Sequence, residues 1–429
     1  MAEETLRFPD GFLWGVVSHA ERREEPKRCN TTSRLSVPQR PEAAGTGAPA
    51  GGRTNFERLE DDLALITSLG VNSYRFALDW SCLEPEAGVW DTAAVENYRR
   101  VLDALTTAGV VPFVTLSHDR IPLWLAQRGG WESDGVDAAF EHYTRRAVRS
   151  FGGYVRHWVT MSDPVLYAYQ AYVAGVAPPG VKSWRRAVRV CRNLVKGHVG
   201  AYHAIHDEAE TMRSEVQVGL AKHYRTFEPV TNSSIMNRLT AITFDYFFND
   251  VLPNSLREGI LGFPLGFNRY VPDMEGCFDF LGLNYYTRDL VGWRSKYLKQ
   301  CFRSLGDRIG SGDIYPEGLY RLLEHAAGYG KPLYITENGI ATDDDALRCR
   351  FIACHLTRLH DAVEMGGDIR GYFCYSLTDG PDLQTGLVRV DAGDLQRRIK
   401  PSGRLYGDVC RENGLSPGLL REYCPNLSD

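Results

Sequence analysis

The sequence lacks several features that would assign it to a class at once. No run approaches about 18 consecutive apolar residues, so no membrane-spanning helix is expected. The net charge of −5 over 429 residues gives no basic surface of the kind that binds nucleic acid. The start, MAEETLRFPDGFLWG, has no basic region followed by an apolar stretch, so no secretion signal is expected and we predict a cytoplasmic protein.

The ten cysteines include no C-x-x-C pair. In a cytosolic chain of this size they are expected to be reduced and mostly buried, and we predict neither a metal site nor a cofactor. A glycine-rich phosphate turn after an early strand is also missing, although a nucleotide-binding doubly wound sheet would need one. The expected partner is therefore a small-molecule substrate, and the sequence leaves the oligomeric state open.

Short apolar or β-branched runs alternate along the chain with longer helical patterns. Eight runs are expected to be strands: residues 11–17, 72–78, 109–116, 155–161, 215–221, 278–286, 332–337 and 369–377. Residues 58–70 and 93–109 carry apolar side chains at helical spacing. A doubly wound sheet would give a similar alternation, but it lacks its phosphate turn here. The pattern thus predicts an α/β protein, a (β/α)8 TIM barrel, with residues 1–429 as one domain.

One segment breaks the alternation. Residues 31–54, TTSRLSVPQRPEAAGTGAPAGGRT, are rich in Pro, Gly, Ala and Ser and show neither helical nor strand periodicity. We expect a long, flexible loop after the first strand. In a barrel such a loop lies over the carboxyl ends of the strands, where active sites are found. A plain linker and a lid both fit this composition.

Polar residues gather where the expected strands end. They are Arg22, Arg75, His118, Asp163, Asn284, Tyr286 and Glu337. Polar groups that converge on one rim of a barrel are typical of a catalytic pocket. Asp163 and Glu337 follow or close two different strands and are expected to face each other. A facing carboxylate pair suits glycoside cleavage, because one acid protonates the leaving oxygen while the other attacks or stabilises the cationic carbon.

Asp163 has a second interpretation from its neighbours. It lies in the triplet Ser-Asp-Pro, which is typical of a helix N-terminus, since Ser and Asp accept hydrogen bonds from free N–H groups and Pro suits the first turn. The residues alone leave both a cap and a catalytic acid open.

Six stretches follow one another in order along almost the whole chain: FPDGFLWGV, YRFALDWSCLEPEAGVWD, PLWLAQRGGWE, FLGLNYYTR, ITENGI and GLVRVD. Together they resemble glycoside hydrolase family 1, the β-glucosidase family. The resemblance implies the barrel fold and places Glu337 at the position of the nucleophile that forms a glycosyl–enzyme ester. Arg75 and Tyr286 match residues that hold this carboxylate ionised, since a nearby cation or hydroxyl donor favours the charged form.

The same resemblance places Asp163 at the proton donor, with a departure. The family has Asn-Glu-Pro where this chain has Ser162-Asp163-Pro164. Retaining enzymes hold their carboxyls about 5–5.5 Å apart and inverting enzymes about 6.5–9.5 Å. The shorter side chain moves the acid back by about 1.5 Å, one bond length. A water could then enter, or proton transfer could weaken. Ser162 also lacks the longer reach of Asn to the sugar's 2-hydroxyl.

The positions that recognise the sugar differ more strongly from the family. Arg22 replaces a Gln, His118-Asp119 replaces a His-aromatic pair, Tyr375 replaces a Trp, Asp382 replaces a Glu, and Leu383 replaces a stacking Trp, while His118 and Asn284 remain. Contacts of this kind select a hexose because a buried polar group left unbonded is costly. The altered set no longer specifies an unmodified hexose.

Three hypotheses fit these observations. The favoured one is a divergent family 1-like glycosidase that uses retaining carboxylate-pair chemistry on an atypical glycoside, such as a secondary-metabolite conjugate. In the second, the barrel performs acid/base chemistry on a non-sugar compound that Arg22 and Arg120 would bind. The third is a pseudoglycosidase that binds a ligand without turnover. The retention of Arg75, Tyr286 and Glu337 argues against simple decay.

Overall fold

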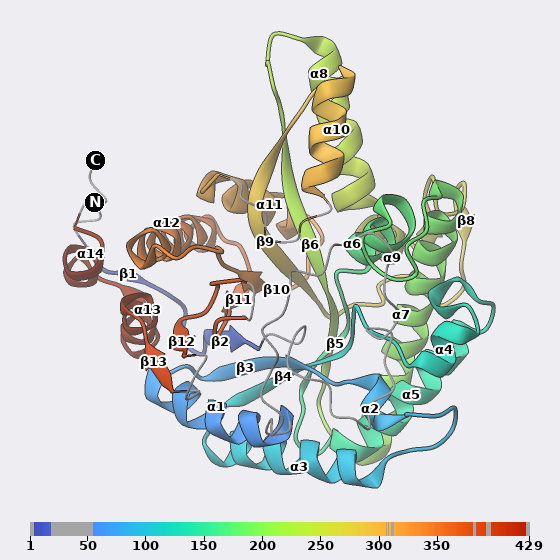
Figure 1. Ribbon diagram of the computed structural model, residues 1–429, viewed down its shortest axis with the longest axis horizontal. Coiled ribbons are helices and arrows are strands. Elements are labelled where there is room, and N and C mark those ends of the chain that lie inside the picture. Colours follow the sequence, from blue (N-terminus) through green and yellow to red (C-terminus); the bar gives the residue numbers. More distant parts are fainter. Residues whose placement is uncertain are drawn as a thin grey trace.

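A computed structural model describes residues 4–18, 55–305, 307, 309, 313–380, 383–391 and 396–425, with the backbone alone for residues 55–61. Its centre is a closed barrel of eight strands, each parallel to its neighbours (Figure 1). Around the barrel the strands run in the order β10 (Leu333–Asn338), β11 (Ile369–Tyr375), β2 (Leu13–Val17), β3 (Ser73–Ala77), β4 (Val111–His118), β5 (His157–Ser162), β6 (Gln217–Pro229) and β9 (Phe280–Val291). Each strand falls on one of the predicted runs, so the TIM-barrel prediction is confirmed.

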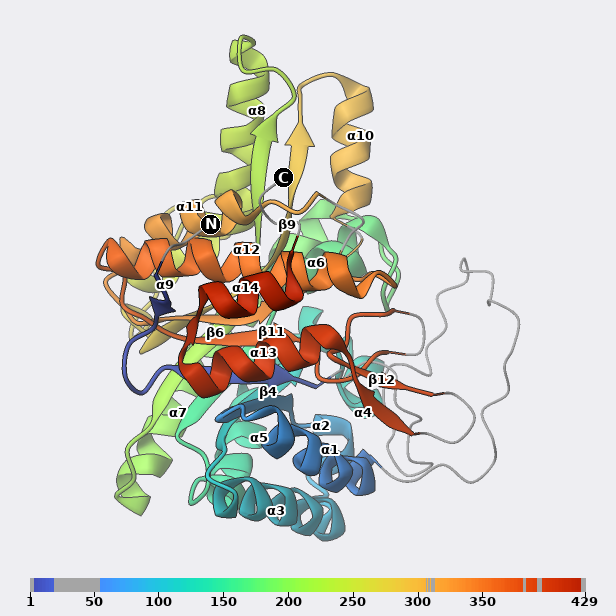
Figure 2. The ribbon, with the colours of Figure 1, turned by 90° about the vertical axis from the view of Figure 1, so that its left-hand side faces the viewer.

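Helices surround the barrel and cover the outward faces of its strands (Figures 1 and 2). The longer ones are α1 (Asn55–Leu69), α3 (Thr92–Thr107), α5 (Val136–Phe151), α7 (Trp184–Met212), α8 (Ile235–Asp245), α9 (Val251–Glu258), α10 (Ser295–Ser304), α11 (Pro316–Ala327), α12 (Asp345–Glu364) and α13 (Pro401–Glu412). The first two correspond to the helices predicted at residues 58–70 and 93–109. Because strands and helices alternate, the strands are buried on both faces, which explains their near-continuous apolar runs.

Short elements complete the chain. They are α2 (Trp80–Leu83), α4 (Leu123–Gln127), α6 (Pro164–Tyr169), α14 (Pro417–Tyr423), the 3-10 turn Gly130–Glu132, the π-helical turns Gln170–Ala174 and Tyr246–Asp250, and the pairs β1 (Leu6–Arg7) with β14 (Gly414–Leu415), β7 (Ile260–Leu261) with β8 (Arg269–Tyr270), and β12 (Val388–Val390) with β13 (Arg397–Ile399). Large apolar side chains fill the barrel interior, among them Phe113, Val159, Phe280, Tyr334 and Phe373. The polar residues at the carboxyl ends therefore lie above a packed apolar floor.

Two strands continue far beyond their predicted ends. β6 was expected to stop at residue 221 and β9 at residue 286, yet their mutual pairing runs on to Pro229 and Val291. Among the described strands, they pair past Ala221 and Tyr285 only with each other. We call residues 222–245 and 286–304 the arm. It comprises this ribbon with α8 and α10 and projects from the barrel in both views (Figures 1 and 2).

The cysteines largely follow the prediction. Among the described cysteines eight are free thiols, and six of these eight are buried. Cys82 is an exception, because it is disulfide-bonded. The expectation of a reduced thiol is wrong there, since pairing depends on proximity in space and not on spacing in the sequence. Within the described ranges, no helix has the length and apolarity to cross a membrane.

Candidate active site

Glu337 lies next to the end of β10 and its side chain is fully buried. Arg75 of β3 reaches it across the barrel, with Nη1 2.5 Å from Oε1, and the same Nη1 donates to the carbonyl oxygen of Thr336 at 3.0 Å. The hydroxyl of Tyr286 donates to the other carboxylate oxygen, Oε2. A buried carboxylate held by a guanidinium and a hydroxyl donor is stabilised in its charged form.

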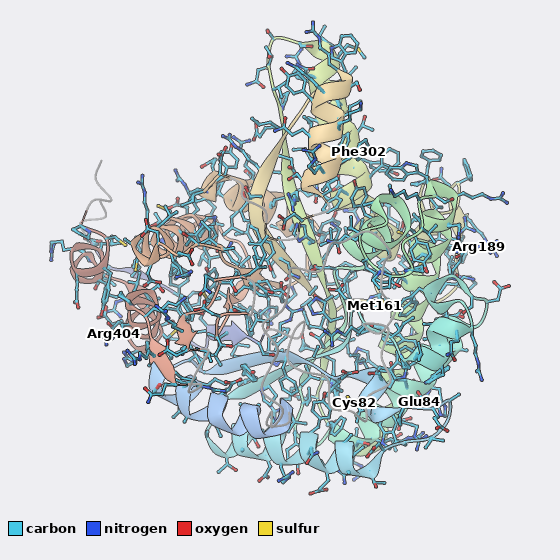
Figure 3. The ribbon with its side chains drawn as sticks, in the orientation of Figure 1. Cys82, Glu84, Met161, Arg189, Phe302 and Arg404 are labelled. Carbon is cyan, nitrogen blue, oxygen red and sulfur yellow. The ribbon has the colours of Figure 1, made fainter. Side chains whose placement is uncertain are left out.

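Asp163 directly follows β5, the strand that Met161 marks in Figure 3, and is also fully buried. It occupies the N-cap position of α6, but its side chain makes no capping hydrogen bond. The capping interpretation is therefore wrong. The backbone is left-handed, with φ 53° and ψ 44°, which is uncommon for a residue with a side chain. Oδ1 instead accepts a hydrogen bond of 2.8 Å from Nδ2 of Asn284.

A continuous set of hydrogen bonds joins the two carboxylates. Nη2 of Arg75, whose Nη1 holds Glu337, donates to Oγ of Ser162 at 2.9 Å. Nδ2 of Asn284 lies 3.4 Å from the same Oγ and 2.8 Å from Asp163. The hydroxyl of Thr336 donates to Oδ1 of Asn284 at 2.7 Å, and this fixes which end of the amide faces Asp163. The structure thus brings together the predicted residues on four strands, β3, β5, β9 and β10.

The remaining predicted positions lie at the rim or outside the described part of the chain. His118 ends β4, and its Nε2 lies 3.5 Å from Oδ2 of Asp119, whose backbone is left-handed with φ 58°. Tyr375 ends β11 and meets the ring of Tyr286 edge-on, with the ring centroids 5.7 Å apart. Arg22, Asp382 and the loop at 31–54 lie outside the described residues.

Two residues at the base of the arm were not predicted. The ring of His223 stacks on that of Tyr286 at 5.5 Å with an interplanar angle of 25°. Nε of Arg225 donates to Nε2 of His223 at 3.0 Å, and Nη1 of Arg225 lies 3.1 Å from Oδ2 of Asp289. Because Nε2 accepts, this neutral imidazole carries its proton on Nδ1. The sequence does hold a signal for this pair. His223 and Arg225 are two residues apart and follow an apolar run, and in a strand this spacing puts both side chains on the same face.

A buried lysine lies on the opposite side of the same strand. Lys222 is fully buried, and its Nζ lies 2.9 Å from the carbonyl oxygen of His223 and 4.0 Å from the centre of the Tyr224 ring. Burial lowers the pKa of Lys222 from 10.5 to about 7, although nearby carboxylates, including those of Asp250 and Asp163, favour its charged form. Lys222 therefore lies on the face of β6 opposite His223, and it does not belong to the hydrogen bonds around Glu337.

A (β/α)8 barrel whose carboxyl-end rim holds two buried, linked carboxylates has the architecture of a glycoside-cleaving enzyme. The sequence pattern of glycosyl hydrolase family 1 matches residues 4–415. The chain therefore belongs to glycosyl hydrolase family 1, a family of β-glucosidase-like hydrolases, and the resemblance seen in its motifs is confirmed.

Similar proteins span the chain from end to end. Beta-glucosidase A of Thermotoga maritima is 30% identical over 95% of this chain and 99% of its own length. The coniferin beta-glucosidase of Pinus contorta is 29% identical over 91% of this chain and 89% of its own. Among solved structures, a beta-glycosidase from Pyrococcus horikoshii superposes with a TM-score of 0.84 at 31% identity over 98% of each chain. A family 1 β-glucosidase from Thermotoga maritima in complex with isofagomine lactam gives 0.82 at 27% identity, over 96% of this chain and all of that one.

Proposed function

We propose that this family 1 hydrolase cleaves an atypical glycoside with retention, using Glu337 as the nucleophile and Asp163 as the acid/base. The observation that carries the proposal is the hydrogen-bond set that buries both carboxylates and links them through Arg75, Ser162 and Asn284. A buried charge persists in a protein where it is paired and hydrogen-bonded. Glu337 meets that condition through Arg75 and Tyr286, whereas Asp163 accepts a hydrogen bond from the neutral amide of Asn284.

The reaction has two steps. A carboxylate oxygen of Glu337 bonds to the anomeric carbon while the bond from that carbon to the leaving oxygen breaks, and Asp163 gives its proton to that oxygen. Asp163, now ionised, then takes a proton from water, whose oxygen attacks the anomeric carbon and releases Glu337. Since Asn284 donates to Oδ1 of Asp163, the proton to be transferred belongs on Oδ2. The cationic Arg75 keeps Glu337 ionised for the attack.

The substrate is proposed from the donor side of the site. Asp163 is a shorter acid than the family's Glu, and Ser162 is engaged by Arg75 and lies near Asn284. Leaving groups that depart as stable anions need less protonation, so a short acid suits a glycoside with a good leaving group. A conjugate of a phenolic or similarly stabilised natural product meets this requirement. The position next to His118 is a carboxylate, Asp119, which favours a substrate more polar there than an aromatic neighbour would accept.

Covalent trapping tests the proposal. The protein is incubated with a panel of 2-deoxy-2-fluoro glycosides that carry dinitrophenolate leaving groups, and the intact mass is measured. We expect the mass to rise by one fluoroglycosyl unit, located at Glu337 by peptide mapping, and to stay unchanged in Glu337→Gln. A folded wild type that stays unlabelled across gluco, galacto, manno and fuco compounds contradicts the proposal. Thermal stabilisation by small carboxylates and not by sugars would then support chemistry on a non-sugar compound.

A further inference from the structure

The outward face of α8 is apolar along its whole length. Ile235, Leu239 and Ile242 are 64%, 51% and 65% exposed, and their spacing places them in one row on the helix. The opposite face is already used, because Ala241 is buried and Phe244 contacts Phe302 of α10, labelled in Figure 3, at a ring distance of 5.4 Å. One apolar face of α8 therefore packs against the rest of the arm, and the other is exposed.

A second row beside the first extends this surface. It begins with Met236, 53% exposed, and ends with Phe247, 37% exposed, in the turn after α8. The residues between them are Thr240 and Thr243, whose hydroxyls donate to the carbonyl oxygens of Met236 and Leu239, each at 2.8 Å. These threonines thus satisfy their hydroxyls within the helix and leave their methyl groups to the surface.

The surface continues onto the segment after α9. The ring of Phe247 lies 5.9 Å from that of Phe263, which lies 5.3 Å from that of Phe267. Phe263 and Phe267 are 48% and 79% exposed. We define the apolar band as Ile235, Met236, Leu239, Ile242, Phe247, Phe263 and Phe267. At roughly 100 Å² exposed per side chain, the band offers on the order of 700 Å².

That size matches an interface more closely than an ordinary surface. The largest apolar patch of a monomer is typically about 300–600 Å², whereas each partner of a standard interface contributes about 800 Å². Interfaces between identical subunits are also more apolar than others. Within residues 235–245, Arg238 carries the one exposed charge, because Asp245 is half-buried against Asn249. The α8 part of the band is therefore poor in charge and offers little to a charged partner.

We propose that the apolar band is the interface through which two copies of this chain form a symmetric dimer. Across a two-fold axis the same surface must meet itself. An axis between Leu239 and Ile242 lays the two α8 helices antiparallel and brings Ile235 of each copy beside Phe247 of the other. The arm projects from the barrel (Figure 2), which leaves α8 open to the approach of a second copy. This inference does not depend on the catalytic proposal.

Sedimentation velocity from about 1 to about 100 µM protein tests the dimer, since a subunit equilibrium depends on concentration. We expect the wild type to reach the dimer mass in this range. Leu239→Glu places two carboxylates near the axis and should raise the dissociation constant at least about 100-fold. Met365→Glu is the matched control: Met365 is 77% exposed at the end of α12, outside the arm, and its variant should dimerise like the wild type.

Two outcomes overturn the proposal. One is a wild type that stays monomeric at the highest concentration, including a monomer that instead sediments with anionic phosphatidylserine vesicles. The other is a dimer that Leu239→Glu and Ile242→Glu leave intact, which would place the interface elsewhere. Far-UV circular dichroism of each variant shows that it is folded. Because hydrolysis is not the readout, a failed dimer and a failed catalytic assignment are told apart.

Discussion

The two sides of the candidate site are held by different kinds of group. On one side Glu337 is bonded by the permanently charged guanidinium of Arg75 and by the hydroxyl of Tyr286. On the other side Asp163 is bonded by Asn284, a neutral amide, from a left-handed backbone position. A cation locks a carboxylate in its charged form, whereas an amide that donates to one oxygen leaves protonation of the other open. The proposed mechanism needs such a difference, between a nucleophile that stays ionised and an acid/base that exchanges a proton.

The largest effect is expected on the charged side. Glu337→Gln keeps the shape of the side chain but removes the attacking oxygen, so we expect kcat to fall by about 10⁴-fold or more with an aryl glycoside substrate. Arg75 would then be a buried cation without its carboxylate, and the free energy of unfolding should fall by about 3–5 kcal/mol. Steady-state kinetics and urea unfolding measure the two effects. Glu324→Gln, at an exposed position of α11, should change neither. If Glu337→Gln keeps a tenth of the activity, Glu337 is not the nucleophile.

On the donor side the effect should depend on the substrate. Asp163→Asn removes the transferable proton, so glycosides with poor leaving groups should be cleaved about 10²–10³-fold more slowly. Dinitrophenyl glycosides need little protonation, and their first step should change by less than about tenfold. Pre-steady-state bursts separate that first step from the hydrolysis of the ester, which also needs Asp163. An equal loss for both leaving groups would exclude Asp163 as the proton donor and remove the contrast between the two sides.

The sequence predicted the barrel because each strand is buried on both faces and reads as an apolar run. The extension of β6 into the arm was not predicted. β6 continues through His223 and Arg225, and an apolar pattern ends before such polar residues. In the structure Arg225 is buried, and its guanidinium donates hydrogen bonds to His223 and Asp289. The contact with Asp289 joins residues that are far apart in the sequence, so the residue pattern of β6 does not reveal it.

The site was predictable where residues end strands, since parallel strands bring their carboxyl ends to one rim. Hydrogen bonds join Arg75, Asn284, Tyr286 and Glu337 into one group at that rim, and their roles in catalysis stay a prediction. The capping interpretation of Asp163 failed for a conformational reason. A cap usually needs an extended backbone at that residue, and the left-handed φ of 53° turns the side chain toward Asn284 instead.

A smaller effect is expected from removing the second donor to Glu337, the hydroxyl of Tyr286. Tyr286→Phe keeps the ring that stacks on His223 but removes the hydroxyl that donates to Glu337. The carboxylate then loses one of its donors, so kcat/KM should fall by about tenfold, equivalent to ~1.4 kcal/mol and close to the lower end of the range for a hydrogen bond to a charged group. The acidic limb of the pH–rate profile should move to higher pH, because the charged form has lost stabilisation. Tyr320→Phe on α11 is the control. An unmoved acidic limb would mean that this hydroxyl does not support the charge.

The smallest effect on turnover is expected from Lys222, and the effect of this buried lysine is measured mainly through stability. Burial lowers the pKa of Lys222 to about 7, from 10.5 when exposed. Below about pH 7 both the folded and the unfolded chain hold this proton, so it adds no pH dependence. Between about pH 7 and 10.5 the unfolded chain holds a proton that the folded protein has released, so the free energy of unfolding should rise with pH by up to ~1.4 kcal/mol per unit.

Replacing the lysine should remove that rise. Urea unfolding of Lys222→Met at pH 6, 7, 8 and 9 is expected to show a flatter dependence than the wild type, with the variant more stable at pH 6 because no charge is buried. Lys196→Met, at an exposed position of α7, should keep the slope of the wild type. Asp163 is among the carboxylates that favour the charged lysine, so the basic limb of the pH–rate profile is the second measurement. If Lys222→Met leaves both the pH dependence of stability and the basic limb of the pH–rate profile unchanged, Lys222 is protonated from pH 6 to 9. Its buried positive charge then acts on Asp163 throughout this pH range.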